Sequence, residues 1–477
     1  ATAILYEGLR YLGADVDYFI PHRINDGYGF GMSAVTYAKE INATLVITVD
    51  SGITSFDALS YARQQGLDVI VTDHHEPLFD DSLILPDAYT IVNPKIMQTR
   101  YEPYKLHDLS GSGVAFKLVQ ALIDDIDRLM SMFDLVAIGT SADVVSVLGE
   151  NRIFLSHGMR LIKDGSRIGI TKLKEISGMK NGDFKTYHLN FLINPRINAP
   201  GRVDNPKDVV RMLISDSVDE AERIARWAHE MNHKRKQIEE TVLKDAYEKV
   251  EKMGSLGNAI VVAGNNWHLG VIGIVASRLS EYYCLPTFVF SIEDGIAKGS
   301  ARSYNSFNVL EGLKRCSHLL DRFGGHKQAA GITMKAGNLE QFRIMIDDIV
   351  KELSDGSKEP FIMVDAAVDL NDIDVGLIRE ISQLEPFGNG NEEPLFGSKL
   401  LEVVDSRVVG NNHLRMNVKQ NGRVVNCIAF DMAGEIGDIQ GGFIDAIFVP
   451  TLNEQYNNQL QLHIKAFRPS IGGDAEI

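Results

Sequence analysis

The sequence is poor in cysteine and has no long apolar run. Its 477 residues include three cysteines, Cys284, Cys316 and Cys427, which lie far apart. Thiols so few and so widely spaced provide neither a disulfide framework nor a cysteine-based zinc motif, which favours the reducing cytoplasm. No apolar stretch approaches the roughly 18 residues of a membrane span, and no signal peptide is visible, so we expect no association with a membrane.

Positive charge is also scarce. The chain has 48 Lys and Arg against 64 Asp and Glu, a formal net charge of −16. Because non-specific affinity for nucleic acid comes largely from neutralising phosphates, this balance argues against a protein that coats nucleic acid through bulk charge. Any nucleic-acid path must be local, and acidity that only keeps a protein in solution is the alternative. The length predicts about three domains.

Two apolar, β-branched runs end in polar side chains. Residues 67–72 lead into Asp73-His74-His75, and residues 43–49 lead into Asp50. Each motif alone also fits a turn, a helix cap or solvated histidines. Because ligands collect at the carboxyl ends of parallel strands, the repetition predicts that these groups converge on one edge of a sheet.

A third run, residues 16–20, is predicted to be a strand of the same kind and is followed by Pro21-His22-Arg23. Carboxylate oxygens suit hard ions such as Mg²⁺ and Mn²⁺, and an imidazole among carboxylates favours Mn²⁺ or another transition metal. The strand ends therefore predict a site for a divalent cation.

Three short motifs carry a resemblance to a known family. Residues 49–52 (VDSG), 72–75 (TDHH) and 142–145 (ADVV) resemble, in order and spacing, successive motifs of the DHH phosphoesterase superfamily. Later segments narrow the match to the RecJ-type single-strand-specific exonucleases, and the resemblance covers nearly the whole chain. It implies an α/β, doubly wound parallel-sheet DHH domain, a long connecting helix, a second α/β DHH-associated domain and a C-terminal all-β, OB-like barrel.

The predicted domains follow this plan. They are a DHH catalytic domain at 1–215, a connecting helix at 216–255, a DHH-associated domain at 256–358, an OB-like domain at 359–471 and a tail at 472–477. Strand and helix patterns alternate from Asp15 to about Ser215. Apolar residues recur at three- and four-residue steps from Val218 to Met253, which predicts one helix roughly 50 Å long.

The first residues, from Ala1 to Gly13, already follow a helical pattern. In the family, a strand and an Asp-rich D-x-D-G motif with further metal ligands precede this helix, and the printed sequence lacks them. If the printed chain is the whole molecule, we expect a crippled second metal position and weak or lost cleavage in a surviving fold.

Some further polar residues have two interpretations. Asp143 ends the apolar segment 133–142 and is either a buried cap or a metal ligand, and the resemblance selects the ligand. Gly111-Ser112-Gly113 is either a phosphate loop or a small-residue helix start. His229 and His233 lie four apart on the long helix, but no third ligand is evident, so we expect them to be solvated.

The segment 194–202 (NPRINAPGR) is predicted to be an irregular loop with two Arg and two Asn. A guanidinium binds phosphate oxygens in a plane, so such a loop suits a terminal phosphate, and a plain domain junction is the alternative. RecJ-type proteins carry a similar sequence near the substrate, which favours Arg202, together with Asn198, as substrate ligands.

The DHH-associated segment offers a second set of candidates. Ser300 and Arg302 lie two apart on a predicted strand, so both point to one face and suit one phosphate. Residues 322–331 (RFGGHKQAAG) pair glycines before a histidine, which permits close approach of backbone to a ligand. The resemblance assigns Gly325 to substrate binding and His326 to the scissile phosphate.

The C-terminal part alternates short strand-like runs with turn residues. The runs are 361–364, 399–404, 413–418, 423–428 and 459–464. This spacing predicts a small all-β barrel, for which the family has a single-strand-binding OB-fold, and a generic β-sandwich is the alternative. Exposed aromatic rings for base stacking are not identifiable from the pattern.

The resemblance implies a metal-dependent exonuclease that degrades single-stranded DNA 5′ to 3′ to nucleoside 5′-monophosphates in DNA repair and recombination. Two cations, Mn²⁺ or Mg²⁺, would activate a water and neutralise the scissile phosphate. The expected metal ligands are Asp50, His74 and Asp143, the expected catalytic group is Asp73, His75 and His326, and the expected substrate ligands are Arg23, Asn198, Arg202, Ser300, Arg302 and Gly325.

Single-stranded DNA is the expected partner of a monomeric protein, with a helicase and a single-strand-binding protein as candidate protein partners. Two alternatives stay open. A DHH phosphodiesterase for short oligonucleotides or cyclic dinucleotides would need neither the barrel nor the long helix. A non-catalytic nucleic-acid-binding relative would fit the missing first motif.

Overall fold

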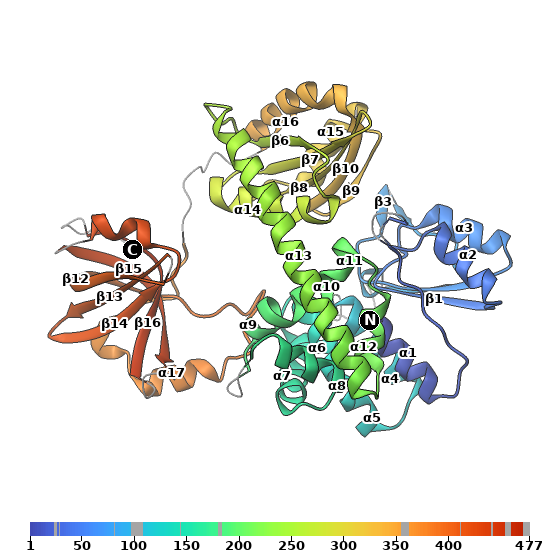
Figure 1. The fold of residues 1–477 in the computed structure, drawn as a ribbon, viewed down its shortest axis with the longest axis horizontal. Helices are drawn as coiled ribbons and strands as arrows, with labels where there is room; N and C mark the ends of the chain where they lie inside the picture. Colours follow the sequence, from blue (N-terminus) through green and yellow to red (C-terminus); the bar gives the residue numbers. More distant parts are fainter. Residues whose placement is uncertain are drawn as a thin grey trace. The chain divides into compact units, whose positions relative to one another are not determined.

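The computed structural model describes residues 1–22, 26–27, 29–80, 82–96, 108–143, 145–179, 184–353, 362–410, 412–439, 442–453 and 459–470. The chain divides into two compact units, residues 1–145 with 149–360 and residues 146–148 with 361–477, and each is described by itself (Figure 1). Arg23 and the predicted tail 472–477 lie outside the described residues. Within the described ranges, no helix has the length and apolarity needed to cross a membrane.

The first unit begins with a small parallel sheet. Its strands β1 (Leu45–Val49), β2 (Asp68–Thr72) and β5 (Thr90–Val92) are arranged in the order β1-β2-β5. Apolar side chains of α2 (Met32–Glu40) and α3 (Phe56–Gln64) pack with β2 to form its core. A short hairpin of β3 (Leu78–Asp80) and β4 (Ser82–Ile84) follows β2.

The prediction of a strand at residues 16–20 is wrong, because the segment is extended without belonging to a strand. The predicted alternation of strands and helices up to Ser215 also stops early, because β5 is the last strand before Ser215 in the described residues. The described residues between 111 and 214 are mainly helical. The helices are α4 (Gly111–Leu122), α5 (Ile126–Ser131), α6 (Phe133–Ala142), α7 (Gly149–Asp164), α8 (Ile168–Ile176) and α12 (Lys207–Ile214), and α1 (Thr2–Tyr11) packs on α4. Most side chains of α6 are buried, so its sequence lacks the periodic change between apolar and polar residues that distinguishes a helix from a strand.

The segment 194–202 is helical, so its prediction as a loop is also wrong. Helical backbone runs through α9 (Thr186–His188), the π-helix η3 (Leu189–Ile193), α10 (Asn194–Asn198) and α11 (Pro200–Val203). Pro195 and Pro200 stand in the first turns of α10 and α11, where a missing N–H costs nothing. The prolines that suggested a loop therefore mark helix starts.

The long helix is confirmed as α13 (Val218–Glu251), 34 residues beginning at the N-cap Ser217. It packs on α8 and α12 near its beginning and on α14 (Leu269–Tyr283) and β6 (Ile260–Asn265) further along.

The second α/β domain is a mixed sheet in the order β6-β7-β8-β10-β9. Its other strands are β7 (Thr287–Glu293), β8 (Ile296–Arg302), β9 (Arg322–Gly325) and β10 (Ala329–Lys335). Side chains alternate between two cores: Phe288 and Phe290 pack with α15 (Val309–Arg315) and α16 (Leu339–Leu353), whereas Val289 packs with α13 and α14. The predicted α/β character of this domain is confirmed.

The second unit contains a closed barrel of five described strands. They are β12 (Phe396–Val409), β13 (His413–Gln420), β14 (Arg423–Ala429), β16 (Gln459–Pro469) and β15 (Phe443–Asn453), and β15 pairs back with β12. β11 (Ala366–Ala367) adds to β12, and α17 (Val375–Ser382) packs on β15. The predicted barrel is confirmed, but β15 was missed and Ile362–Val364 form no strand.

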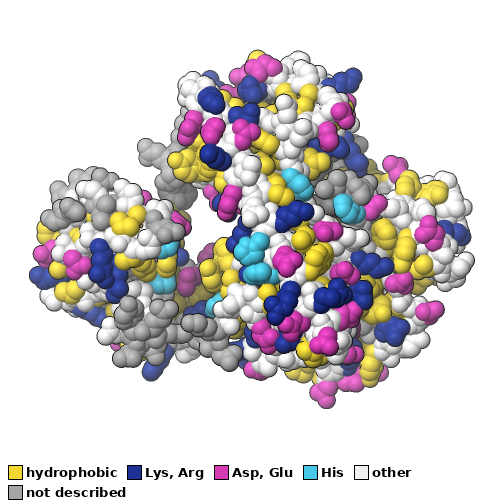
Figure 2. Space-filling view, in the orientation of Figure 1, with side chains coloured by type: hydrophobic (Ala, Val, Ile, Leu, Met, Phe, Trp, Pro, Cys, Tyr) yellow, Lys and Arg dark blue, Asp and Glu magenta, His cyan; other side chains and the backbone are white. Residues whose placement is uncertain are grey.

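The described short 3₁₀-helices are η1 (Pro94–Ile96), η4 (Ser317–Leu319), η5 (Ala336–Asn338), η6 (Leu370–Asp372) and η7 (Ala433–Asp438). On the face drawn in Figure 2, Lys and Arg are interspersed with Asp and Glu.

Candidate metal centre and nucleic-acid interface

Three predicted metal ligands converge from three elements. Asp50 follows β1, His74 follows β2, and Asp143 caps the C-terminus of α6. The Nε2 atom of His74 lies 3.1 Å from Asp50 Oδ1 and 3.1 Å from Asp143 Oδ2. Parallel pairing of β1 with β2 places the first two side chains at one sheet edge, as the strand-end pattern predicted.

The donor set fits a divalent cation. Asp50 Oδ1 is buried and has no hydrogen-bond partner among the described residues, which is costly for a carboxylate oxygen unless a cation satisfies it. Potential ligand atoms of Asp50, His74 and His75 all lie within 4.8 Å of one another. Asp50 also has a φ of +60°, a strained conformation for a residue with a side chain.

Gly111 makes room for this carboxylate. A Cβ atom on Gly111 would lie 2.2 Å from Asp50 Oδ1. Of the two interpretations of residues 111–113, the structure shows the helix start: α4 begins at Gly111, and the N-cap Ser110 side chain accepts a hydrogen bond from the Gly113 N–H. The small residue is needed for close packing of α4 against the end of β1.

Asp73 supports the two histidines that follow it. It is 1% exposed, and its carboxylate accepts hydrogen bonds from the backbone N–H groups of Ile53 and His74 and lies 2.6 Å from His75 Nδ1. Burial alone raises the pKa of Asp73, but the hydrogen bonds from His75 and Ile53 outweigh it and lower the pKa. The same bond raises the pKa of His75 against the opposing effect of burial. With Nδ1 directed to Asp73, His75 keeps Nε2 for other contacts.

His326 brings the second α/β domain to this cluster. Its ring stacks on His75, with centroids 5.6 Å apart and planes 15° from parallel. Partial burial, followed by the charge of His75, lowers the pKa of His326. Gly325 precedes it with a φ of +152°, and a Cβ there would lie 2.3 Å from the Ala329 carbonyl oxygen. Only glycine permits this turn at the end of β9.

Three of the other predicted substrate ligands, Ser300, Arg302 and Arg202, lie along α14. Arg302 donates to Ser300 Oγ at 3.1 Å and to Ser277 Oγ at 3.0 Å, so the predicted shared face is confirmed. Arg202 donates to the Gly270 carbonyl oxygen at 3.1 Å. Gly270 and Ser277 lie on one face of α14, which therefore connects the guanidinium of Arg202 to the pair on β8.

A polar cavity of about 300 Å³, here called the asparagine pocket, is lined in part by Ala142, which directly precedes Asp143 in the chain. Its lining includes Ser141, Asn190, Asn194, Asn198, Arg202 and Arg235. The structure thus brings Asn198 and Arg202 together with Asn194 of the same predicted segment, and adds two residues, Asn190 and Arg235, that sequence reasoning missed. The four-residue spacing of positions 190, 194, 198 and 202 was visible in the sequence, but it has meaning only when the segment is helical.

His229 is not simply solvated, contrary to expectation. It is partly buried, and its Nδ1 accepts a hydrogen bond from Arg196 Nε at 3.0 Å, while its Nε2 lies 3.1 Å from Nε2 of His233. Burial, Arg196 and His233 lower the pKa of His229. Because Arg196 donates to Nδ1, the neutral ring carries its proton on Nε2, which disfavours a metal there.

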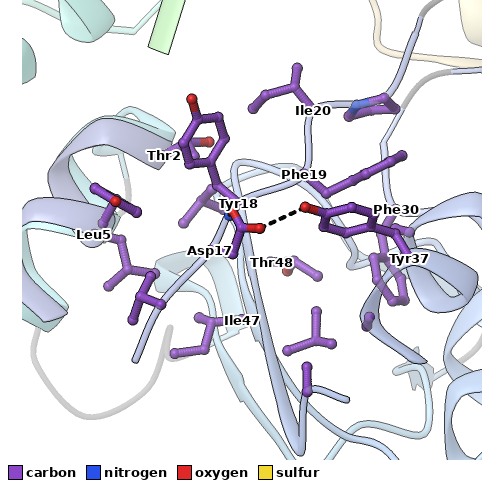
Figure 3. A pocket seen from close by; sticks show the side chains of 18 of the residues that line it. Thr2, Leu5, Asp17, Tyr18, Phe19, Ile20, Phe30, Tyr37, Ile47 and Thr48 are labelled. Atoms are coloured by element: carbon purple, nitrogen blue, oxygen red, sulfur yellow. Dashed lines mark hydrogen bonds between the residues drawn. The ribbon is translucent and has the colours of Figure 1, made fainter. Parts of the chain in front are cut away.

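A second cavity, of about 920 Å³, runs along β1 (Figure 3). Residues of α1, α2 and the segment 14–21 line it together with Leu45–Val49, and Asp50 lies among its lining residues. Tyr37 donates to Asp17 across it at 2.6 Å, and this bond raises the pKa of Tyr37 to about 12. The segment that was expected to be a strand thus lines a cavity that it shares with β1.

In the barrel, one exposed aromatic ring stands between two histidines. Phe430 is 52% exposed, and its ring centroid lies 5.2 Å from that of His413 and 5.6 Å from that of His463. The structure thereby singles out a candidate for base stacking that the sequence pattern did not identify.

Comparison with known proteins agrees with this architecture. Three family models match in series: the DHH family, N-terminal domain, at residues 1–140, the DHHA1 domain at 256–352 and the RecJ OB domain at 364–466. The single-stranded-DNA-specific exonuclease RecJ of Haemophilus influenzae is 33% identical over 459 residues, which cover 91% of this chain and 78% of that protein. The chain belongs to the RecJ family.

Further RecJ proteins cover the chain almost completely. The RecJ exonuclease of Bacillus subtilis is 37% identical over 476 residues, 98% of this chain, and the chain spans 59% of the length of that relative. The crystal structure of RecJ from Thermus thermophilus in complex with Mn²⁺ superposes with a TM-score of 0.82 at 30% identity, covering 100% of this chain and 68% of that one. The predicted family and fold class are confirmed.

Proposed function

We propose that this RecJ-family chain carries the hydrolytic centre of an exonuclease that degrades single-stranded DNA from its 5′ end and releases nucleoside 5′-monophosphates. The observation that carries the proposal is the position of His74 Nε2, 3.1 Å from a carboxylate oxygen of both Asp50 and Asp143. The substrate class is supported by the relatives from Haemophilus influenzae and Bacillus subtilis, which are named single-stranded-DNA-specific exonucleases.

Asp50, His74 and Asp143 would hold a divalent cation. Two carboxylates and an imidazole suit Mn²⁺, and Mg²⁺ is the second candidate. The Thermus relative was crystallised with each of these ions. A bound ion supplies a water of lowered pKa and neutralises charge on the scissile phosphate. The family resemblance implies a second ion beside the first.

The chain's own groups orient the reaction. Asp73 is a positioning residue, because its carboxylate is engaged by backbone N–H groups and by the ring of His75. His75 Nε2 and the ring of His326 stacked on it then face the phosphate as the catalytic pair. Keeping Nδ1–H on the Asp73 side leaves Nε2 of His75 to accept or donate a proton at the phosphate oxygen.

The terminal phosphate would bind along α14. Ser300 and Arg302 offer a hydroxyl and a guanidinium side by side, and Arg202 adds a second guanidinium near the start of the same helix. Asn198 in the asparagine pocket and the backbone at Gly325 complete the proposed substrate contacts.

Because the proposed substrate is single-stranded, another protein must supply the single strands. The proposed protein partners are therefore a helicase and a single-strand-binding protein. We propose that the enzyme itself is a monomer. We place the reaction in the reducing cytoplasm, which the three free thiols support.

The test is release of mononucleotides from a 5′-labelled single strand, the matching duplex and a cyclic dinucleotide in the presence of Mn²⁺. We expect release from the single strand alone, at least about a hundredfold lower in Asp50→Ala. Asp68→Ala, an exposed Asp at the start of β2, is the matched control and should keep full activity.

Release from the cyclic dinucleotide alone would contradict the proposal and support a small-substrate phosphodiesterase. Binding of Mn²⁺ and of the single strand without any release would contradict it in favour of a non-catalytic binding protein.

A further inference from the structure

Three residues that closely follow a metal ligand pack with the second unit instead of the first. Ser146, Val147 and Leu148 belong to the unit that contains residues 361–477, although the chain on either side of them belongs to the first unit. Asp143 lies three residues before Ser146, and α7 begins directly after Leu148. We call residues 146–148 the clasped segment.

A loop of the second unit holds the clasped segment. Val147 is 4% exposed, and its backbone N–H donates to the Asn389 carbonyl oxygen at 2.6 Å. A Cβ atom on Gly388 would lie 2.6 Å from Val147 Cγ2, and one on Gly390 would lie 2.8 Å from Ser146 Oγ. The loop therefore approaches the segment closely because these two positions carry no side chain.

The loop that holds Val147 is itself well ordered by hydrogen bonds. We call residues 384–391 the glycine loop. Gly388 and Asn391 exchange backbone hydrogen bonds of 2.9 and 3.0 Å. The side-chain amide of Asn391 donates to the carbonyl oxygens of Leu384 and Pro386, each at 2.9 Å. The seat of Val147 is thus a defined surface of the second unit.

The position of Asp143 depends on the direction in which the chain leaves α6. Its backbone N–H still donates to Gly139, but its ψ of 154° is extended, so the helix ends at this residue. Its Oδ2 lies 3.1 Å from His74 Nε2. Three residues span at most roughly 10 Å, so a displaced clasped segment would pull on the backbone of Asp143.

We propose that Val147 is a positioning residue for the metal centre: its seat in the glycine loop fixes the chain that follows Asp143 and so keeps the Asp143 carboxylate beside His74. This inference rests on the proposed function, in which Asp143 is a metal ligand, and adds that the second unit contributes to Mn²⁺ affinity. Because coupling between two sites is reciprocal, Mn²⁺ must also strengthen the seating of Val147.

The first test crowds the seat and measures metal binding. Gly388→Ala places a methyl group 2.6 Å from Val147 Cγ2, which must move away. We expect calorimetric titration to show a Mn²⁺ affinity lower by about five- to tenfold. Gly434→Ala is the matched control, because a Cβ there meets no atom within 4 Å, and it should bind Mn²⁺ like the unmodified chain.

A second variant tests whether the contact with Val147 carries the effect. Val147→Ala removes both Cγ atoms, so in Gly388→Ala/Val147→Ala the new methyl group has room and the backbone bond to Asn389 can form again. We expect the Mn²⁺ affinity of this double variant to return to that of Val147→Ala alone. Thermal unfolding without metal confirms that each variant is folded.

Hydrogen exchange measures the reciprocal effect. Addition of Mn²⁺ should slow exchange of the Val147 amide in the unmodified chain, because this N–H is bonded only while the segment is seated. In Asp143→Ala the same addition should leave its exchange unchanged. A peptide from β13, residues 413–420, is the internal control and should exchange at the same rate with and without Mn²⁺.

Unchanged Mn²⁺ affinity in Gly388→Ala would overturn the proposal and show that α6 and the buried Val145 suffice to hold Asp143. Weakened binding that Val147→Ala does not restore would overturn it as well. If the unmodified chain takes up no Mn²⁺, the metal assignment of the proposed function is wrong and this inference falls with it.

Mononucleotide release by the unmodified chain separates the two levels of inference. If release occurs and Gly388→Ala binds Mn²⁺ normally, only the role of Val147 is wrong. If Mn²⁺ binding depends on the glycine loop but no release occurs, only the hydrolytic function is wrong.

Discussion

The Nε2 atom of His74 and the Oδ1 atom of Asp50 lie 3.1 Å apart, yet the carboxylate oxygen has no hydrogen-bond partner among the described residues. The two atoms are within ion-pair distance but lack the geometry of a hydrogen bond, so the oxygen keeps an unused acceptor site. A buried carboxylate oxygen in this state is a strong acceptor for a cation.

We expect Mn²⁺ to raise the unfolding temperature of the chain, because an ion that binds only the folded state stabilises it in proportion to the logarithm of its concentration. Asp50→Asn should remove most of this dependence while the metal-free protein stays folded, since the amide keeps the shape but not the charge. Thermal unfolding at a series of Mn²⁺ concentrations measures this dependence of the unfolding temperature on Mn²⁺, with Asp68→Asn as the control. An equal response of both variants to Mn²⁺ would contradict the assignment of Asp50.

Gly111→Ala should damage the metal centre more than the fold. The added Cβ would lie 2.2 Å from Asp50 Oδ1, so the carboxylate must move away from His74. We expect a loss of about 1–3 kcal/mol in the free energy of unfolding and a larger loss in Mn²⁺ affinity. Urea unfolding and calorimetric titration measure the two quantities. Gly337→Ala, where no atom lies within 4 Å of the new Cβ, is the matched control, and Mn²⁺ affinity equal to that control would refute the packing argument.

Stability should fall on acidification partly because of His229. Its pKa is lowered by burial and by Arg196, so the unfolded chain binds the proton more readily than the folded one. The contribution is fully present above the unfolded pKa of about 6.5 and is lost as the pH falls through the lower folded value.

Urea unfolding at several pH values between 7.5 and 5 measures this contribution. His229→Gln keeps an acceptor for Arg196 but does not titrate, so its stability should decline less over this range. His318→Gln replaces an exposed histidine in η4 and should decline like the unmodified chain. An identical decline of the His229 variant would show that this ring does not carry the effect.

Local patterns in the chain were sufficient for several elements. The β-branched runs before Asp50 and Asp73 predicted β1 and β2, because period and composition are properties of neighbouring residues. The three- and four-residue steps after Val218 predicted α13 for the same reason. Local rules misled where context decides: prolines inside 194–202 suggested a loop, and the apolar run 16–20 suggested a strand that forms no ladder with β1.

The sequence alone determined which chemical groups were available: carboxylates and imidazoles at strand ends, and paired glycines before His326. Only the tertiary structure decided which of them meet. The approach of Asp143 to His74, the stacking of His326 on His75 and the union of Asn194 with Arg235 join positions far apart in the chain. Such contacts arise from the packing of whole helices and sheets, whose relative positions no local pattern encodes.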